Sequence, residues 1–248
     1  IITAFNFPGA VWAWNAMIAA VCGDVMVWKP SSKTPITAIA IQKIVNQVLD
    51  PLGWNGVMSL LVGSSRDVGE MLIHDRRIPL VSATGSCNMG RKIGGAVSKR
   101  LARSLLELGG NNGIIVMPDA DPELVLRAVV FGAVGTAGQR CTSTRRLFLH
   151  KDIASDMIER LVTSYSQVSI GDPLDPKTLM GPLVDATAVK DFTDALKIVR
   201  EEGGEILYGG KEIESSGFYV EPTIVRANNE MKIAREETFA PILYLFEF

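Results

Sequence analysis

Residues 78–108 read IPLVSATGSCNMGRKIGGAVSKRLARSLLEL and contain two apolar runs with a helical segment between them. The runs at 78–84 and 104–108 predict strands, and the glycine-containing segment 86–99 predicts a helix. Neither run alternates regularly between apolar and polar residues. Strands of this kind, separated by helices, are typical of a parallel sheet that is covered on both faces. The stretch therefore predicts an α/β fold.

The same alternation extends back to the start of the chain. We expect strands at residues 1–4, 24–29 and 57–62, and helices at 8–23, 34–48 and 66–74. Residues 1–109 are thus predicted to form a doubly wound, Rossmann-like dinucleotide-binding domain. After the Gly-Gly pair at 109–110 the pattern restarts, so residues 110–248 are predicted to form a second α/β domain, which carries the catalytic cysteine. Its expected strands and helices lie at 113–116 and 145–150, and at 122–134, 153–168 and 184–202.

Composition describes an ordinary globular protein. The chain has 248 residues, 47% hydrophobic and 21% charged, with a formal net charge of -2, which argues against a nucleic-acid surface. Three widely spaced cysteines make no disulfide framework and indicate a reducing compartment. The most apolar helical stretch, 11–22, is too short to span a bilayer, and no metal-ligand spacing is present. Because residue 1 is Ile and the chain stops inside an apolar run, we expect an internal piece of a longer protein, truncated at both ends.

The segment Gly138-Gln139-Arg140-Cys141-Thr142 presents a thiol among small and polar residues. It follows a helical run and precedes a basic segment, so the thiol is expected to be reachable and flanked by positive charge. Both conditions favour a reactive thiolate near neutral pH. The alternative is that this cysteine is a small buried hydrophobe, as most free cysteines are.

Three further segments follow predicted parallel strands, at whose carboxyl ends ligands of doubly wound sheets bind. Asn6 follows the first strand, Lys29 and Ser32 the second, and Gly85 with Ser86 the strand at 78–84. The turn at Gly85 suits a phosphate bound at a helix N-terminus, although it lacks the G-x-G-x-x-G pattern. Such a turn also occurs between a strand and a helix that bind no ligand. Lys29 could equally be a solvated strand end.

Glu107 lies in the otherwise apolar segment 105–108. Burial there would raise its pKa and suit it to general-base catalysis, whereas the alternative is a salt-bridged structural carboxylate. The two histidines, His74 and His150, are not near Cys141 in the expected arrangement. A carboxylate is therefore the better candidate base.

Six segments occur in order along the chain: FNFP (5–8), KPSSKTP (29–35), TGS (84–86), LELGG (106–110), GQRC (138–141) and EETFAP (236–241). Together they resemble the NAD(P)-dependent aldehyde dehydrogenase superfamily. The segments LGGNN (108–112) and GQRCT followed by RRL (145–147) most resemble its antiquitin branch, the α-aminoadipic semialdehyde (piperideine-6-carboxylate) dehydrogenases. The resemblance covers essentially the whole chain.

The resemblance implies a role for each residue of these segments. Cys141 would attack the aldehyde, Asn6 and the Cys141 backbone N–H would hold the oxyanion, and Glu107 would activate the water that hydrolyses the thioester. Arg140 would hold the amino-acid end of a semialdehyde substrate. The implied cofactor contacts are Lys29 and Ser32 for the adenosine ribose, Gly85 and Ser86 for the pyrophosphate, Gly109, and Glu237 and Phe239 for the nicotinamide ribose and ring.

Four residues depart from the family pattern: Phe5, Ala83, Ala240 and Ser32. Ser32 stands where many NAD-preferring members carry Glu, and loss of that negative charge beside Lys29 and Lys33 makes NADP possible. The resemblance to the antiquitin branch implies NAD, which is therefore expected. The resemblance also implies a cytoplasmic homo-oligomer, dimer or tetramer, that acts in lysine catabolism on a small aldehyde, without nucleic acid or membrane partners. Two alternatives stay open, a CoA-acylating or reductive relative and a non-catalytic binding or structural protein on the same scaffold.

Overall fold

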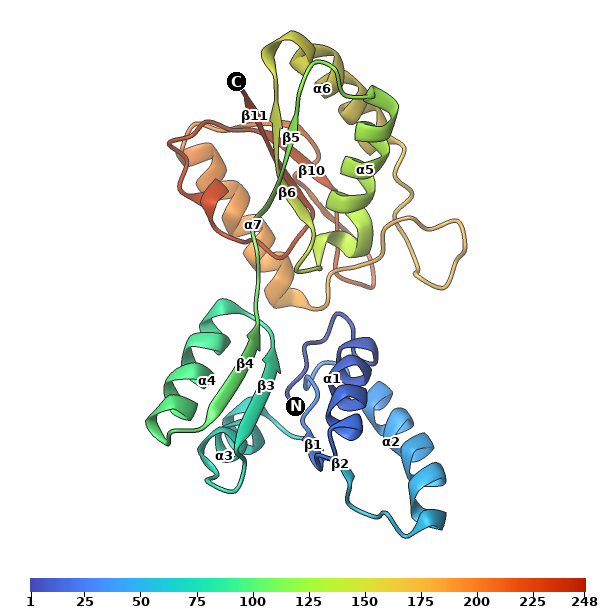
Figure 1. Ribbon diagram of the computed structural model, residues 1–248. Coiled ribbons are helices and arrows are strands. Elements are labelled where there is room, and N and C mark those ends of the chain that lie inside the picture. Colours follow the sequence, from blue (N-terminus) through green and yellow to red (C-terminus); the bar gives the residue numbers. More distant parts are fainter. The chain divides into compact units, whose positions relative to one another are not determined.

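The computed structural model describes residues 1–248, which divide into two compact units, Ile1–Gly109 and Gly110–Phe248 (Figure 1). The division lies at the Gly-Gly pair after which the strand–helix pattern of the sequence restarts. Each unit has its own strands and its own buried apolar residues, which form two small cores in unit 1 and one large core in unit 2.

Unit 1 alternates strands and helices throughout its length. A 3-10 turn (Asp50–Leu52) follows α2, and a π-helical turn (Ser65–Gly69) occupies the first half of the helix expected at 66–74. The strands are β1 (Met26–Trp28), β2 (Met58–Leu60), β3 (Leu80–Thr84) and β4 (Arg103–Glu107), and the helices are α1 (Ala10–Val21), α2 (Pro35–Leu49), α3 (Glu70–His74) and α4 (Cys87–Lys99).

The N-terminal segment joins the strand pairs of unit 1 into one parallel arrangement. β1 pairs with β2 and β3 with β4, both in parallel, and Ile2 bridges Lys29 on one side and Ala83 on the other. The strand expected at 1–4 is therefore reduced to bridges at Ile2. The spatial order is β2, β1, the N-terminal segment, β3, β4. Numbered along the chain this is 3-2-1-4-5, the order of the doubly wound dinucleotide-binding fold, so the predicted fold class is confirmed.

Unit 1 has two small cores, and Ile2 belongs to the second of them. Trp12 of α1 stacks on Trp28 of β1 with ring centroids 4.8 Å apart, beside the buried Ala38 of α2. The second core contains Val81 of β3 and Val97 of α4. Parallel strands are almost always joined by right-handed crossovers, so the reversal of direction across the sheet after β2 is expected to place α4 on the face opposite α1 and α2.

Unit 2 is built on a sheet of order β5-β6-β11-β10-β7, parallel except for β7 against β10. Figure 1 shows α5 and α6 on one side of this sheet and α7 on the other. A separate hairpin is formed by β8 and β9. The elements are β5 (Asn112–Val116), α5 (Pro122–Val134), β6 (Thr144–Leu149), α6 (Lys151–Ser166), α7 (Ala186–Glu201), β7 (Glu205–Tyr208), β8 (Glu212–Ile213), β9 (Tyr219–Val220), β10 (Thr223–Arg226) and β11 (Ile242–Glu247).

The core of unit 2 explains why these segments adopt this fold. Leu147 of β6, Ile224 of β10, Leu245 of β11 and Phe192 of α7 are fully buried. The central strands are apolar on both faces because helices cover both sides of the sheet. The segments that precede β5, β6 and β11 are thereby placed by a rigid scaffold.

Candidate active site

Unit 1 gathers its predicted site residues at one edge of the sheet. Asn6 follows the N-terminal segment, Lys29 and Ser32 follow β1, and Glu107 ends β4. Because all these strands are parallel, their carboxyl ends meet at the same edge. The reversal of strand order lies between the N-terminal segment and β3, which is where such sheets bind their ligands.

The turn at Gly85 begins α4 at this edge. The Gly85 N–H donates to the Glu107 carbonyl oxygen at 3.0 Å, and Thr84 pairs with Glu107 in the sheet. Ser86 is the N-cap, and its hydroxyl accepts from the Met89 N–H at 3.3 Å. A Cβ at Gly85 would lie 2.5 Å from the Met89 Cε, so glycine keeps this approach open. The start of a helix of this length is suited to bind an anion.

Lys29 is buried rather than solvated. Its side chain is 2% exposed, and its Nζ donates to the Pro30 carbonyl oxygen at 2.8 Å. Burial lowers the pKa of the Lys29 ammonium group. The alternative of a solvated strand end is therefore wrong. Ser32 lies exposed in the turn between β1 and α2.

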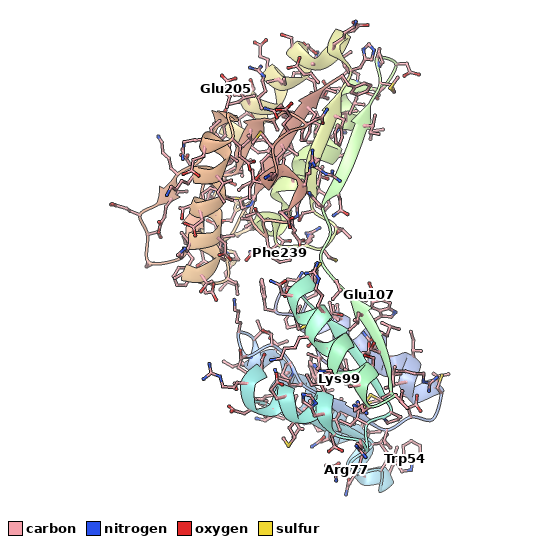
Figure 2. All side chains as sticks on the ribbon, turned by 90° about the vertical axis from the view of Figure 1, so that its left-hand side faces the viewer. Trp54, Arg77, Lys99, Glu107, Glu205 and Phe239 are labelled. Atoms are coloured by element: carbon pink, nitrogen blue, oxygen red, sulfur yellow. The ribbon has the colours of Figure 1, made fainter.

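Glu107 differs from the expectation. We expected a buried carboxylate with a raised pKa, but its side chain is exposed at the end of β4 (Figure 2). β4 has only one neighbouring strand in its sheet, β3, and Leu105 of the same strand is exposed as well. The prediction of burial is therefore wrong. Asn6 is half-buried, and Gly109 is half-buried at the end of the unit.

In unit 2, Cys141 is exposed in a turn between α5 and β6. The alternative of a buried structural cysteine is therefore wrong. α5 ends at Val134 with Gly135 as its C-cap, and the next three residues, Thr136, Ala137 and Gly138, have φ of 57°, 51° and 67°. Such left-handed backbone is uncommon outside glycine, so the segment leading to the thiol is strained.

A buried arginine, Arg145, holds this segment in place. Its guanidinium is 2% exposed and lies over the Phe239 ring, 5.4 Å from the centroid. Burial lowers the pKa of Arg145, and the charges of Glu237 and Cys141 oppose that effect. Its acceptors are five backbone carbonyls and one carboxylate: Gly110 O (3.4 Å), Thr238 O (2.7 Å), Ala240 O (3.4 Å), Gly138 O (3.1 Å), Arg140 O (3.1 Å) and Glu237 Oε1 (3.2 Å).

Arg145 thus joins three predicted site residues of unit 2. Glu237, Phe239 and the Cys141 turn all lie around its guanidinium, and Glu237 Oε1 also accepts from the Gly110 N–H at 3.3 Å. Sequence reasoning missed Arg145. The available signal was an arginine at the second position of a largely buried strand that continues with Leu147, Phe148 and Leu149, where a charged side chain is rare unless it is paired.

Although the Arg140 carbonyl oxygen accepts from Arg145, the Arg140 side chain lies apart from this cluster. Its Nε donates to the Thr136 hydroxyl at 2.7 Å, and its guanidinium lies over the Phe131 ring at 5.2 Å. Its side chain therefore lies along the C-terminal end of α5. A cavity of about 260 Å³ elsewhere in unit 2 is lined by Arg146, Asn228 and Arg235 and does not include Cys141.

Comparison with known proteins identifies the family. The aldehyde dehydrogenase family profile matches residues 1–248. The chain belongs to the aldehyde dehydrogenase family. This confirms the resemblance read from the six sequence segments.

Similar proteins include "Aldehyde dehydrogenase family 7 member A1" of Brassica napus, 48% identical over 248 residues, which cover 100% of this chain and 50% of that protein. "Alpha-aminoadipic semialdehyde dehydrogenase" of Mus musculus is 47% identical over 249 residues, 100% of this chain and 46% of that protein. These names agree with the resemblance to the antiquitin branch. The chain spans about half the length of the curated relatives that it matches.

Solved aldehyde dehydrogenases share the fold. Lactaldehyde dehydrogenase of Escherichia coli has a TM-score of 0.95 and 36% identity and covers 100% of this chain and 52% of that one. Betaine aldehyde dehydrogenase of Staphylococcus aureus, solved with NAD+, has a TM-score of 0.96 and 28% identity, covering 100% and 49%. No helix of this chain is long and apolar enough to cross a membrane. No group of three or more His, Cys, Asp or Glu is placed to hold a metal ion.

Proposed function

We propose that the intact protein oxidises an aldehyde to a carboxylic acid with NAD or NADP, through a covalent thioester on Cys141. The observation that carries this proposal is the exposed Cys141 thiol at the end of a strained segment, fixed by Arg145 beside the Glu237–Phe239 loop. Strained backbone at a fixed position is common at catalytic sites, because the surrounding structure must hold it.

The nucleophile is the Cys141 thiolate. It would attack the aldehyde carbon and give a thiohemiacetal, whose oxyanion would accept from the Asn6 side-chain amide and the Cys141 backbone N–H. One such donor is typically worth about 3 kcal/mol of barrier. The bound dinucleotide would supply the hydride acceptor. Cys141 would then carry a thioester.

Hydrolysis of that thioester is assigned to Glu107. Its carboxylate would take a proton from the attacking water, and the thiolate would leave as the acid forms. Exposure of Glu107 at the end of β4 gives water access to the carboxylate. A CoA-acylating relative would not need this base, which is why a water-dependent reaction is favoured.

The cofactor residues fall in both units. The buried Lys29 and the exposed Ser32 would contact the adenosine ribose, and Gly85 and Ser86 would receive the pyrophosphate at the start of α4, with Gly109 nearby in the chain. In unit 2, Glu237 and Phe239 would bind the nicotinamide ribose and ring. Both donors to Glu237 use Oε1, so Oε2 is the oxygen left for a ribose hydroxyl.

The substrate assigned is α-aminoadipic semialdehyde or a similar semialdehyde. The guanidinium of Arg140 would pair with the substrate carboxylate, a match that arginine makes in bidentate geometry. We also assign the protein to lysine catabolism in the cytoplasm. We expect a homo-oligomer, dimer or tetramer, and size-exclusion chromatography with light scattering would check the number of subunits.

The deciding experiment compares wild type with Cys141→Ser and Glu107→Gln during turnover of α-aminoadipic semialdehyde. Cys141→Ser is expected to lose turnover by several orders of magnitude. Glu107→Gln is expected to release a burst of reduced cofactor and to accumulate acyl-enzyme, detected by mass spectrometry after acid quench. Unchanged steady-state turnover of Glu107→Gln would reject its role. Absence of turnover by wild type with any aldehyde would favour the non-catalytic scaffold instead.

A further inference from the structure

We infer that Arg145 is a positioning residue that couples the nucleophile turn to the cofactor-binding carboxylate of Glu237. The inference deepens the proposed function and rests on it for the roles of Cys141 and Glu237. The contacts of Arg145 themselves are independent of those roles. They join segments that lie about ninety residues apart along the chain.

The guanidinium reaches both segments at once. Its Nη2 donates to Gly138 O and Arg140 O, which lie in the turn just before Cys141. The same nitrogen donates to Glu237 Oε1 on the other loop. Its Nη1 donates to Thr238 O at 2.7 Å. A single nitrogen is therefore shared between the nucleophile turn and the carboxylate. If either segment moves and the guanidinium follows it, the hydrogen bonds between the guanidinium and the other segment lengthen.

The nucleophile segment needs such a tie. Thr136 and Ala137 are held in left-handed backbone, which residues other than glycine rarely adopt. Gly138 packs so closely that a Cβ there would lie 2.4 Å from the Ala240 carbonyl oxygen. The turn thus lies directly against the Glu237–Ala240 loop, and the bonds of Arg145 to both carbonyl sets oppose its relaxation.

A lysine cannot replace this arginine. The acceptors lie around the planar guanidinium, whose N–H groups point in different directions. The ammonium group of lysine carries its three donors on a single nitrogen at the end of a flexible side chain. Arg145→Lys keeps the charge and loses the simultaneous reach. The neighbouring Arg146 provides the matched control, because its Nε and Nη2 both donate to the Asn111 carbonyl and none of its bonds reaches the nucleophile turn or Glu237.

The test compares wild type, Arg145→Lys and Arg146→Lys in the intact protein. Two quantities are measured: the NAD dissociation constant by calorimetry, and the rate at which iodoacetamide alkylates Cys141, with the exposed Cys22 as internal reference in the same sample. In Arg145→Lys we expect the dissociation constant to rise about tenfold and the Cys141 alkylation rate relative to Cys22 to fall about tenfold. Arg146→Lys is expected to change neither.

A folded Arg145→Lys in which only one quantity changes, or neither, overturns the coupling. Should that variant fail to fold, Glu237→Gln decides, since it preserves shape and weakens the bond to Arg145. Slower alkylation of Cys141 in Glu237→Gln supports the inference, and an unchanged rate overturns it. Neither readout needs turnover. A wild-type protein that oxidises no aldehyde would therefore reject the proposed function without deciding this inference.

Discussion

The side-chain amide of Asn112 donates a hydrogen bond of 2.7 Å to the carbonyl oxygen of Cys141. The same nitrogen donates to the Ser143 carbonyl oxygen at 3.0 Å, so one amide holds both sides of the nucleophile turn. Asn112 begins β5, where it pairs with Thr144 of β6. Asn112 thus connects the nucleophile turn to the sheet, and Arg145 connects the same turn to the Glu237 loop.

Replacing Asn112 tests this tie. Asn112→Ala removes both bonds and is expected to lower kcat about tenfold, since misplacement of a nucleophile by a fraction of an ångström has effects of this order. Asn112→Asp is expected to be worse, because its carboxylate would face two carbonyl oxygens that it cannot bond. Steady-state kinetics measure both. Asn46→Asp on exposed α2 is the control, as its oxygen can still accept from Gln42. Equal activity of Asn112→Asp and Asn112→Ala would contradict the assigned donor role.

Gly138 is expected to tolerate no side chain. Its φ of 67° disfavours any other residue, and an added Cβ would lie 2.4 Å from the Ala240 carbonyl oxygen, a backbone atom that cannot move aside cheaply. Gly138→Ala should lower the free energy of unfolding by on the order of 3 kcal/mol.

The matched control is Gly203→Ala. Gly203 has a φ of 79° after the end of α7, and nothing lies within 4 Å of a Cβ placed there. Its substitution carries the backbone strain alone, about 1 kcal/mol. Urea unfolding of both variants measures the difference. Equal losses would mean that the close contact with Ala240 does not matter.

The alternation of apolar runs and helices predicted the α/β pattern of both units, because inner strands such as β1, β6 and β11 are largely buried. The same pattern predicted the sheet edge that carries Asn6, Lys29 and Gly85, since parallel strands must end together. Cys141 was predicted to be reachable from its small and polar neighbours, and it is exposed.

Other features depend on contacts between distant segments, which local patterns do not encode. Thr136 and Ala137 carry no signal of left-handed backbone, because neither is glycine. Arg145 is part of the site because β6 places its guanidinium against the Glu237 loop, a contact between distant segments. The exposure of Glu107 depends on which strands flank β4, and an apolar neighbourhood in sequence did not reveal it.

Tyr244 of β11 predicts a pH dependence of stability. Burial raises its pKa to about 12, the charge of Glu202 adds to the shift, and Thr238 and Arg145 oppose it. Unfolded tyrosine titrates near pH 10, so above that pH the unfolded chain releases a proton that the folded chain retains. The contribution of Tyr244 to the free energy of unfolding is therefore complete below about pH 10 and is lost as the pH rises toward 12.

Comparison with Tyr244→Phe isolates this group from the other tyrosines. At pH 8 the two proteins should differ by about 1 kcal/mol or less. Between pH 10 and 12 the wild type should lose stability relative to Tyr244→Phe by about 1 kcal/mol per pH unit. Urea unfolding at pH 8, 10 and 11 measures the difference. Parallel curves for the two proteins would show that Tyr244 titrates alike in both states.

Ser32 is expected to set the balance between the two dinucleotides. It lies exposed in the turn after β1, close in sequence to Lys29 and Lys33, and in the proposed function it faces the adenosine ribose. A carboxylate there would accept from the ribose 2′-hydroxyl of NAD and repel the 2′-phosphate of NADP. Ser32→Glu should therefore raise the ratio of kcat/KM for NAD over NADP by about tenfold or more, because a like-charge contact that costs about 1.4 kcal/mol at this exposed position already changes the ratio tenfold. Gln47→Glu adds the same charge roughly three turns further along α2 and should leave the ratio unchanged. A ratio that moves equally in both variants would trace the effect to overall charge, and one that moves in neither would remove Ser32 from the ribose site.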